Sequence, residues 1–382
     1  MHSVMRIGAV AAAALTAASI CAGAASAATR GSDAARRGIG QVVFVQTDAT
    51  TGNQVVVYRR ADDGRLTRLA VYATGGRGGV LDGSVVDHLA SQGSLTYDAR
   101  HKLLYAVNAG SDTVSVFAVN GSLLRLRQIV ASHGEFPVSV AVHDDAVYVL
   151  NALGGGSIQG YTVAGGYLRA QRTWNRPLGL DPNATPQFTN TPGQVGFADH
   201  GHDLVVTTKA NGNNVDVFPL RGDGAPARKP VVNNMPGAVP FSFVTDERTG
   251  FLYLTEAGPN AVVSFTVHED GKLTRQRTAS TGGTATCWIT ESDGTLYASN
   301  AGSSTVTVLH AGVDGTMQRV GTTPTDPGAV DSAASSDGRF LYVQTGANGI
   351  LDEFAIRPGG GLTRIGAQTV PNAVGGEGIV AG

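Results

Sequence analysis

The chain has 382 residues with a formal charge of −2, because 28 Lys and Arg nearly balance 30 Asp and Glu. This balance provides no basic stripe for a phosphate backbone, so the composition excludes a nucleic-acid partner. The two cysteines are too few for a disulfide scaffold. The 52 glycines fall at the joints between apolar runs, which is typical of turns and not of a disordered linker.

The N-terminal segment, residues 1–27, has the pattern of a secretory signal peptide. An early arginine precedes an apolar run over residues 7–22, and residues 25–27 read Ala-Ser-Ala, which fits a cleavage site. The apolar run is too short to span a membrane comfortably. We therefore expect a secreted, extracellular protein without a membrane anchor, with residues 28–40 as a flexible leader. Only Cys287 would remain after cleavage, so no intramolecular disulfide could form.

From residue 41 onward, one pattern of strands and turns occurs seven times. Each copy has a short apolar strand that ends in a small or polar residue, then a strand such as Val-x-Val-Phe, then Asp-Gly or Gly-Gly. The second copy reads LYAVNAGSDTVSVFAVNGSLLRL over residues 104–126. A strand-built period of about forty residues indicates a β-propeller in which each repeat forms one four-stranded blade.

The two ends of the repeat region complement each other. The first copy begins directly at its second strand, residues 41–48, and the chain ends with GEGIVAG, a first strand that no second strand follows. Pairing these two segments would close the ring and remove its exposed edges. We therefore predict an all-β protein: one seven-bladed β-propeller domain over residues 41–382, closed by its C-terminal strand.

The path of a blade brings two sets of residues to one mouth of the central channel. These sets are the starts of the first strands and the ends of the second strands. Two longer insertions, residues 76–93 and 174–192, should open onto the same face, which makes that face the expected binding site. The first set is Ser94, Ser139, Gln194, Phe241, Cys287 and Asp331, with Glu377 near the seventh place. The second set is Asp48, Asn108, Asn151, Lys209, Glu256, Asn300 and Thr345.

Lys209 and Glu256 are the predicted catalytic pair, because they are oppositely charged and come from adjacent blades. A carboxylate beside an ammonium can act as a base held by a cation, or the two can serve as anion binder and proton donor. Gln194 would add a hydrogen bond from the neighbouring strand. On this hypothesis the variant Glu256→Gln should lose activity. The alternative is a structural ion pair that caps the channel.

The remaining polar and aromatic residues of the two sets are predicted to contact the substrate. They are Asn108, Asn151, Asn300, Asp331, Cys287, Trp288 and Phe241. Neither set contains a histidine that could activate Cys287, which favours a buried, inert thiol. His88 lies on the first insertion, and His133 could reach the mouth. The sequence predicts no metal site, because the His200-Gly-His202-Asp203 run falls on the opposite face.

The repeats as a whole resemble the lactonase family of seven-bladed propellers, which includes bacterial 6-phosphogluconolactonase and carboxymuconate cyclase-type enzymes. The residues that carry the likeness are residues 104–120, TPGQVGF with DLVVTTKANGNNVDVF over residues 191–218, residues 239–257, ATCWIT over residues 285–290 and SSDGRFLYVQTG over residues 335–346. Among these, the set over residues 191–218, 239–257 and 285–290 looks most like a secreted actinobacterial branch. The resemblance implies opening or closing of a lactone without a nucleotide cofactor.

The likeness fails at the positions that carry the family's chemistry. Family enzymes commonly show Pro-Arg-His before an aromatic residue, and Asn-Glu at the end of the next strand. The matching residues here are Pro192-Gly193-Gln194, Phe197 and Thr208-Lys209. The fold therefore carries over from the resemblance, and the catalytic residues do not.

Three functions compete at this point. The first is hydrolysis or cycloisomerisation of a small lactone or sugar-acid-type substrate, without a cofactor. The second is a non-catalytic secreted propeller that binds a ligand or an envelope partner. The third is a calcium-assisted lactonase that uses oxygen ligands at the mouth. In each case we expect a monomer with a small-molecule ligand.

Overall fold

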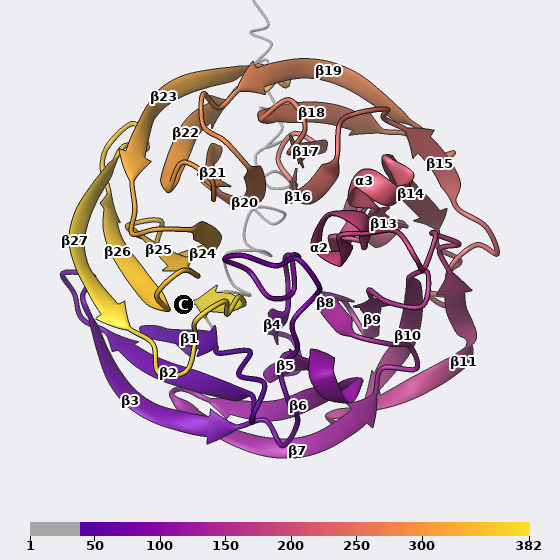
Figure 1. The fold of residues 1–382 in the computed structure, drawn as a ribbon, viewed down its shortest axis with the longest axis horizontal. Helices are drawn as coiled ribbons and strands as arrows, with labels where there is room; N and C mark the ends of the chain where they lie inside the picture. The colour runs from indigo at the N-terminus through magenta and orange to yellow at the C-terminus, as the bar shows by residue number, and fades with distance from the viewer. Residues whose placement is uncertain (1–38) are drawn as a thin grey trace, which may run out of the picture.

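The computed structural model describes residues 39–382, which form a closed ring of seven antiparallel sheets around a central axis (Figure 1). The predicted signal peptide lies outside the described residues, as does the leader as far as residue 38. Ile39 is already buried in the core of the first blade, so the domain begins slightly before residue 41.

Each blade has four strands, numbered from the channel outward. Blade 1 consists of β28 (Ile379–Ala381), β1 (Val42–Gln46), β2 (Gln54–Arg60) and β3 (Leu66–Ala73). Blade 2 consists of β4 (Leu95–Asp98), β5 (Leu103–Asn108), β6 (Thr113–Asn120) and β7 (Leu123–Ala131). Blade 3 consists of β8 (Pro137–His143), β9 (Ala146–Asn151), β10 (Ser157–Ala164) and β11 (Tyr167–Pro177). Blade 4 consists of β12 (Gln194–Ala198), β13 (Asp203–Thr207), β14 (Asn214–Pro219) and β15 (Val231–Asn234).

The last three blades follow the same plan. Blade 5 consists of β16 (Pro240–Asp246), β17 (Phe251–Glu256), β18 (Ala261–Val267) and β19 (Leu273–Ser280). Blade 6 consists of β20 (Thr286–Ser292), β21 (Thr295–Asn300), β22 (Thr305–Ala311) and β23 (Met317–Pro324). Blade 7 consists of β24 (Ala329–Ala334), β25 (Phe340–Thr345), β26 (Ile350–Ile356) and β27 (Leu362–Thr369).

The C-terminal strand completes the first blade, as the sequence predicted. In the antiparallel pair of β28 and β1, Ile379 lies opposite Val45, and Ala381 lies opposite Val43. Figure 1 shows the yellow C-terminal strand beside the indigo β1, inside the ring. The pairing covers the channel-side edge of β1 and gives blade 1 four strands like the other blades, so the ring is closed.

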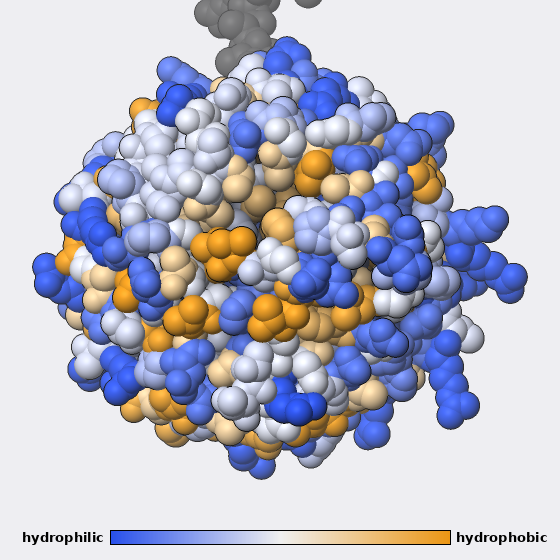
Figure 2. Space-filling view, viewed as in Figure 1, coloured by the Kyte–Doolittle hydropathy of each residue, from blue (hydrophilic) through white to orange (hydrophobic). Residues whose placement is uncertain are grey.

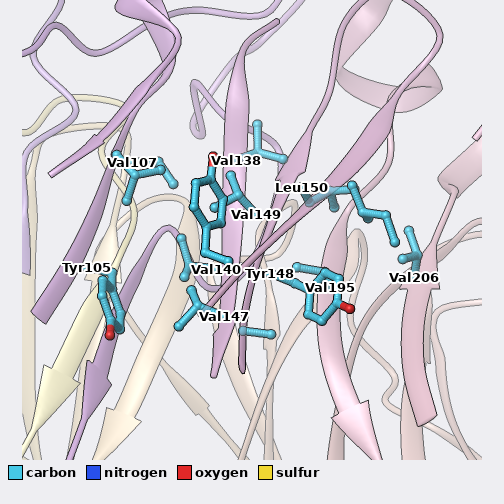
Figure 3. Packing of buried hydrophobic residues seen from close by; sticks show 14 of the residues in the cluster. Tyr105, Val107, Val138, Val140, Val147, Tyr148, Val149, Leu150, Val195 and Val206 are labelled. Atoms are coloured by element: carbon cyan, nitrogen blue, oxygen red, sulfur yellow. The ribbon is translucent and has the colours of Figure 1, made fainter. Parts of the chain in front are cut away.

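The core lies between neighbouring blades, because both faces of the second and third strands are covered. The second strands are buried along almost their whole length, and the outer strands alternate between buried and exposed residues. Figure 3 shows one such layer, in which Tyr105, Val107 and Val138 pack with Tyr148 and other residues of blades 2 to 4. Burial of about 25 cal/mol per Å² of apolar surface at each interface stabilises the ring.

The helices are single turns inside loops. They are η2 (Ala109–Ser111), α2 (Gln187–Asn190), η3 (Asp199–Gly201) and α3 (Lys209–Gly212). No helix within residues 39–382 is long and apolar enough to cross a membrane. The second insertion contains α2, which packs beside α3 on the viewed face of Figure 1.

Candidate functional site

The first insertion plugs the central channel. Residues 86–92, here called the plug, reach blades on opposite sides of the ring. Ser91 accepts the indole N–H of Trp288 at 2.5 Å through its carbonyl oxygen, and its hydroxyl donates to Glu377 Oε1 at 2.7 Å. The Gln92 amide is paired with both backbone groups of Ile289 at 3.0 Å. The predicted lid therefore fills the channel mouth instead of covering it from outside.

Lys209 fastens both insertions to this mouth. Its side chain is only 1% exposed, and Nζ donates to the carbonyl oxygen of Ala90 in the plug at 2.6 Å. It also donates to the carbonyl oxygen of Phe188 in the second insertion at 2.7 Å. These two contacts place both insertions on the face where Lys209 emerges, as expected; we call it the insertion face. Burial lowers the pKa of Lys209 to about 7, against the attraction of Asp87, Cys287 and Glu377.

The structure does not bring Lys209 and Glu256 together, because their strand positions differ by one residue. Thr207 pairs with Val215 of β14 in the way that Thr255 pairs with Val262 of β18, so Thr208 is the equivalent of Glu256. Lys209 is the next residue, in the left-handed conformation with φ of 52°. Side chains of consecutive residues in this region point to opposite sides. Lys209 therefore faces the channel while Glu256 faces along its own blade.

Glu256 is paired with Arg275 of β19 in its own blade. Both guanidinium N–H groups donate to the carboxylate, the longer contact being 3.3 Å from Nη1 to Oε2. The pair lies at an open groove of about 860 Å³ between blades 4 and 5, beside Phe265 and Lys272. This arrangement corresponds to the structural alternative that the sequence left open, with Arg275 as partner in place of Lys209.

Gln194 and the three asparagines are also held by the protein itself. The Gln194 side chain accepts the N–H of Phe243 at 2.7 Å and donates to its carbonyl oxygen at 3.1 Å, which ties blades 4 and 5. Asn108, Asn151 and Asn300 are fully buried, and each donates to hydroxyl groups of its own blade's third strand. Their amides join second strands to third strands, so they do not face a ligand at the mouth.

Phe241, Trp288 and Cys287 do meet at the channel, around the plug. They form one cluster with Val330, against which Val86 of the plug packs. The rings of Phe241 and Trp288 meet edge to face at 4.8 Å, and the ammonium of Lys209 lies 5.3 Å from the Phe241 centroid. Burial raises the pKa of Cys287 to about 12, which is the reverse of what a nucleophilic thiol needs.

Four carboxyl groups are buried in or beside the channel mouth: Asp48, Asp87, Asp331 and Glu377. Burial raises the pKa of Asp331 to about 7, against the N–H of Ser332, which donates to Oδ1 at 2.9 Å. Burial raises the pKa of Asp87 to about 6, against its hydrogen bond with Glu377. Burial and repulsion by Asp87 and Asp331 raise the pKa of Glu377. Burying a charge costs on the order of several kcal/mol, so this concentration at one end of the channel indicates a function.

The sequence analysis did not recognise that Asp48 and Lys209 occupy equivalent positions in blades 1 and 4. Each is the second residue after the second strand of its blade. Both have left-handed backbone angles, with φ of 51° and 52°, whereas the equivalent residues of the other five blades are Ala109, Ala152, Ala257, Ala301 and Gly346. The sixth residue counted from the start of each of these second strands, Val42 and Asp203, is Thr47 and Thr208, and this count would have revealed the offset. His88 of the plug lies next to Asp48, with Nδ1 4.0 Å from Oδ2.

The chemistry available at this mouth is proton transfer and charge stabilisation. It offers an imidazole, four carboxyl groups and one buried ammonium within a ring of apolar side chains. Among the described residues, no group of three or more His, Cys, Asp or Glu side chains could hold a metal ion. Figure 2 shows hydrophobic residues gathered near the centre of the same face. An amphiphilic small molecule suits such a surface.

Comparisons with known proteins show what this chain is similar to. Residues 189–374 match the family described as Lactonase, 7-bladed beta-propeller. No curated protein matches the sequence significantly. A structure from Bacteroides fragilis assigned as a 6-phosphogluconolactonase is 20% identical, with a TM-score of 0.71 over 87% of this chain and 96% of that one. The periplasmic gluconolactonase of Pseudomonas aeruginosa is 17% identical, with a TM-score of 0.69 over 88% and 98%.

At these identities the solved structures show a shared fold, and the family match covers the region from blade 4 to blade 7. The seven blades, the closure by β28 and the match over residues 189–374 agree with one another. Residues 189–374, which span blades 4 to 7, therefore match the lactonase family of seven-bladed β-propellers.

Proposed function

We propose that this protein opens the ring of a small lactone with water at the insertion face. The observation that carries the proposal is the set of buried ionisable groups at that end of the channel. Asp48 and Lys209 occupy a ring position that is Ala or Gly in the other blades, so the fold itself does not require them. Lactone hydrolysis needs a proton-transfer group and a site for the developing negative charge, and this mouth offers both.

In this proposal Lys209 is a positioning residue of the insertion face. Its ammonium holds the carbonyl oxygens of Ala90 and Phe188, so it fixes the plug and the second insertion together. Glu256 and Gln194 have structural roles, because Arg275 and the Phe243 backbone already satisfy them. We propose further that the protein is secreted, since residues 1–27 have the signal-peptide pattern, and that it acts as a monomer without a nucleotide cofactor.

A second candidate function is ligand binding without catalysis. It is favoured by one observation: each of the three residues predicted as catalytic already has its partners within the protein. A calcium-assisted lactonase is the third, and it would draw on oxygen ligands at the mouth, such as Asp331.

A titration assay on the purified protein separates these functions. The panel contains glucono-δ-lactone, 6-phosphogluconolactone, muconolactone and γ-octalactone, each with EDTA and with added calcium. We expect turnover of at least one lactone at a rate that EDTA does not change. Lys209→Met should lower kcat/KM at least about tenfold by loosening both insertions, whereas Lys229→Met, at an exposed position, should not. Binding without turnover of any lactone would favour the binding module, and loss of activity in EDTA would favour calcium.

A further inference from the structure

Two buried polar atoms without hydrogen-bond partners face each other beside the plug. They are Nδ1 of His88 and Oδ2 of Asp48, which lie 4.0 Å apart. Asp48 is fully buried, and its other oxygen accepts the N–H of Gly79 at 3.3 Å. A small rotation of the imidazole would join the two atoms in a hydrogen bond. Leaving buried polar atoms unpaired is costly, so the fold maintains this pair against its own stability.

The backbone on both sides of His88 is fixed, and its ring rests on a glycine. The N–H of His88 donates to the carbonyl oxygen of Gly375 at 2.8 Å, and its carbonyl oxygen accepts the N–H of Leu81 at 2.9 Å. A Cβ at position 375 would lie 2.2 Å from the imidazole, so only glycine leaves room for the ring. Nδ1 is buried while the side chain is 24% exposed, so Nε2 is the nitrogen left to meet a ligand.

Three exposed valines lie next to the residues that hold His88. Val80 and Val374 each precede a residue that is hydrogen-bonded to the His88 backbone, Leu81 and Gly375. Val85 comes three residues before His88 in the same loop. They are 49%, 58% and 82% exposed, respectively. Figure 2 shows hydrophobic residues near the centre of this face. We call Val80, Val85 and Val374 the valine rim. Exposed apolar residues next to an unpaired imidazole favour a ligand with an apolar part.

Resting on the proposed lactone-opening function, we infer that His88, oriented by Asp48, transfers the protons of the reaction. We infer also that the substrate is an uncharged lactone whose apolar substituent lies on the valine rim. The valine rim offers contact area to an alkyl chain and no charge to a phosphate.

The step balances with water as the only co-reactant. Nε2 of His88 takes a proton as the water oxygen attacks the lactone carbonyl carbon, and Oδ2 of Asp48 accepts the Nδ1–H. The tetrahedral intermediate then breaks the bond between the acyl carbon and the ring oxygen. The ring oxygen receives the proton from Nε2, and the product is a hydroxy acid.

One proton shared by the pair decides whether Nε2 can act as a base. Burial raises the pKa of Asp48, and burial lowers the pKa of His88. The charged groups around the pair are Asp87 of the plug, which adds to the rise at Asp48, and Glu377 and Lys209, which interact with Asp87. Nε2 can act as a base only after the His88–Asp48 pair has lost the shared proton. We therefore expect kcat/KM to rise with increasing pH.

The test compares the wild type with His88→Gln, Asp48→Asn and the exposed control His202→Gln on γ-octalactone. His88→Gln should lower kcat/KM about 10²- to 10⁴-fold, and His202→Gln should not change it. Asp48→Asn retains the side-chain shape and should move the rise of the pH profile to lower pH, because the imidazole then titrates without a carboxylate. Val85→Ser should raise KM for γ-octalactone about tenfold and leave KM for glucono-δ-lactone unchanged.

The outcomes separate this inference from the proposed function. If the wild type opens lactones and His88→Gln is as active as His202→Gln, the role of His88 is overturned while the proposed function stands. Preference for 6-phosphogluconolactone over γ-octalactone would overturn the substrate class. If no lactone is opened, the proposed function fails. Binding of the lactam analogue of γ-octalactone then tests whether the valine rim binds an apolar substituent. Binding that Val85→Ser weakens would support the rim, and an absence of binding would overturn it.

Discussion

Replacing Asp331 with asparagine should make the stability of the protein less sensitive to pH. Asp331 lies in β24 and is 5% exposed, and burial raises its pKa from 3.8 to about 7. The folded chain therefore holds this proton more tightly than the unfolded chain. The resulting stabilisation is complete below pH 3.8 and is lost as the pH rises through about 7. At 1.36 kcal/mol per pH unit, the total amounts to about 4 kcal/mol.

The window between pH 5 and pH 8 contains about 3 kcal/mol of this loss, because the loss ends near pH 7. Asparagine keeps an acceptor for the N–H of Ser332 and carries no charge at any of these pH values. Relative to the wild type, Asp331→Asn should gain about 3 kcal/mol from pH 5 to pH 8. For a chain of this length, that gain corresponds to about 4 °C in Tm.

Differential scanning calorimetry at constant ionic strength measures this gain directly. The quantity to follow is the Tm of the variant minus the Tm of the wild type at pH 5, 6, 7 and 8. The exposed residue Glu269 provides the control, since Glu269→Gln should give a difference that does not depend on pH. A pH-independent difference for Asp331→Asn as well would refute the reasoning, because it would mean that Asp331 titrates alike in the folded and unfolded chains.

Three further predictions concern the ring and its buried groups. Deleting residues 377–382 should lower Tm sharply and promote aggregation, because it exposes the edge of β1; an unchanged Tm would contradict the closure. Glu256→Gln should lower the free energy of unfolding, measured by chemical denaturation, by about 1–3 kcal/mol, because it weakens the contact with Arg275. The variant should retain lactone hydrolysis, and a hundredfold loss of activity would instead indicate that Glu256 acts as a base. Cys287 should react with a disulfide reagent only after unfolding, since its thiol is buried with a pKa of about 12, and rapid labelling of the folded protein would disprove this.

The fold could be predicted because each blade is encoded locally. Alternating apolar residues mark every strand, and Gly, Asn and Asp mark the turns, so the number of blades follows from counting the copies. Closure by the C-terminal strand followed from the first copy, which lacks a first strand, and the pairing of Ile379 with Val45 confirms it. Both arguments use short-range patterns, which a sequence displays directly.

The candidate site could be predicted only in part, because it depends on single-residue geometry. Phe241, Cys287 and Trp288 were expected at the mouth, and the structure places them there. Lys209 was predicted to end its second strand as Glu256 does, although it lies one residue further along and has a left-handed backbone. A one-residue offset reverses which side a side chain faces, and composition does not reveal it.

The plug was recognised as a functional loop, and its path into the channel was not predicted. That path depends on contacts between residues far apart in the sequence, such as Ser91 with Glu377 and Gln92 with Ile289. These contacts involve ordinary polar residues, whose partners cannot be read from local spacing. His88 acquires its place beside Asp48 in the same way.

The junction of β28 with β1 also sets the order in which the molecule can be completed. Val45 is made early, and its partner Ile379 is made about 330 residues later. Until then, the channel-side edge of β1 has no partner, and the plug has no Glu377 to receive Ser91. Contacts of such large sequence separation form slowly and leave partly folded chains open to aggregation. Pairing of β28 therefore both closes the ring and seats the plug, so an intact candidate site indicates that the chain has been made at least as far as β28.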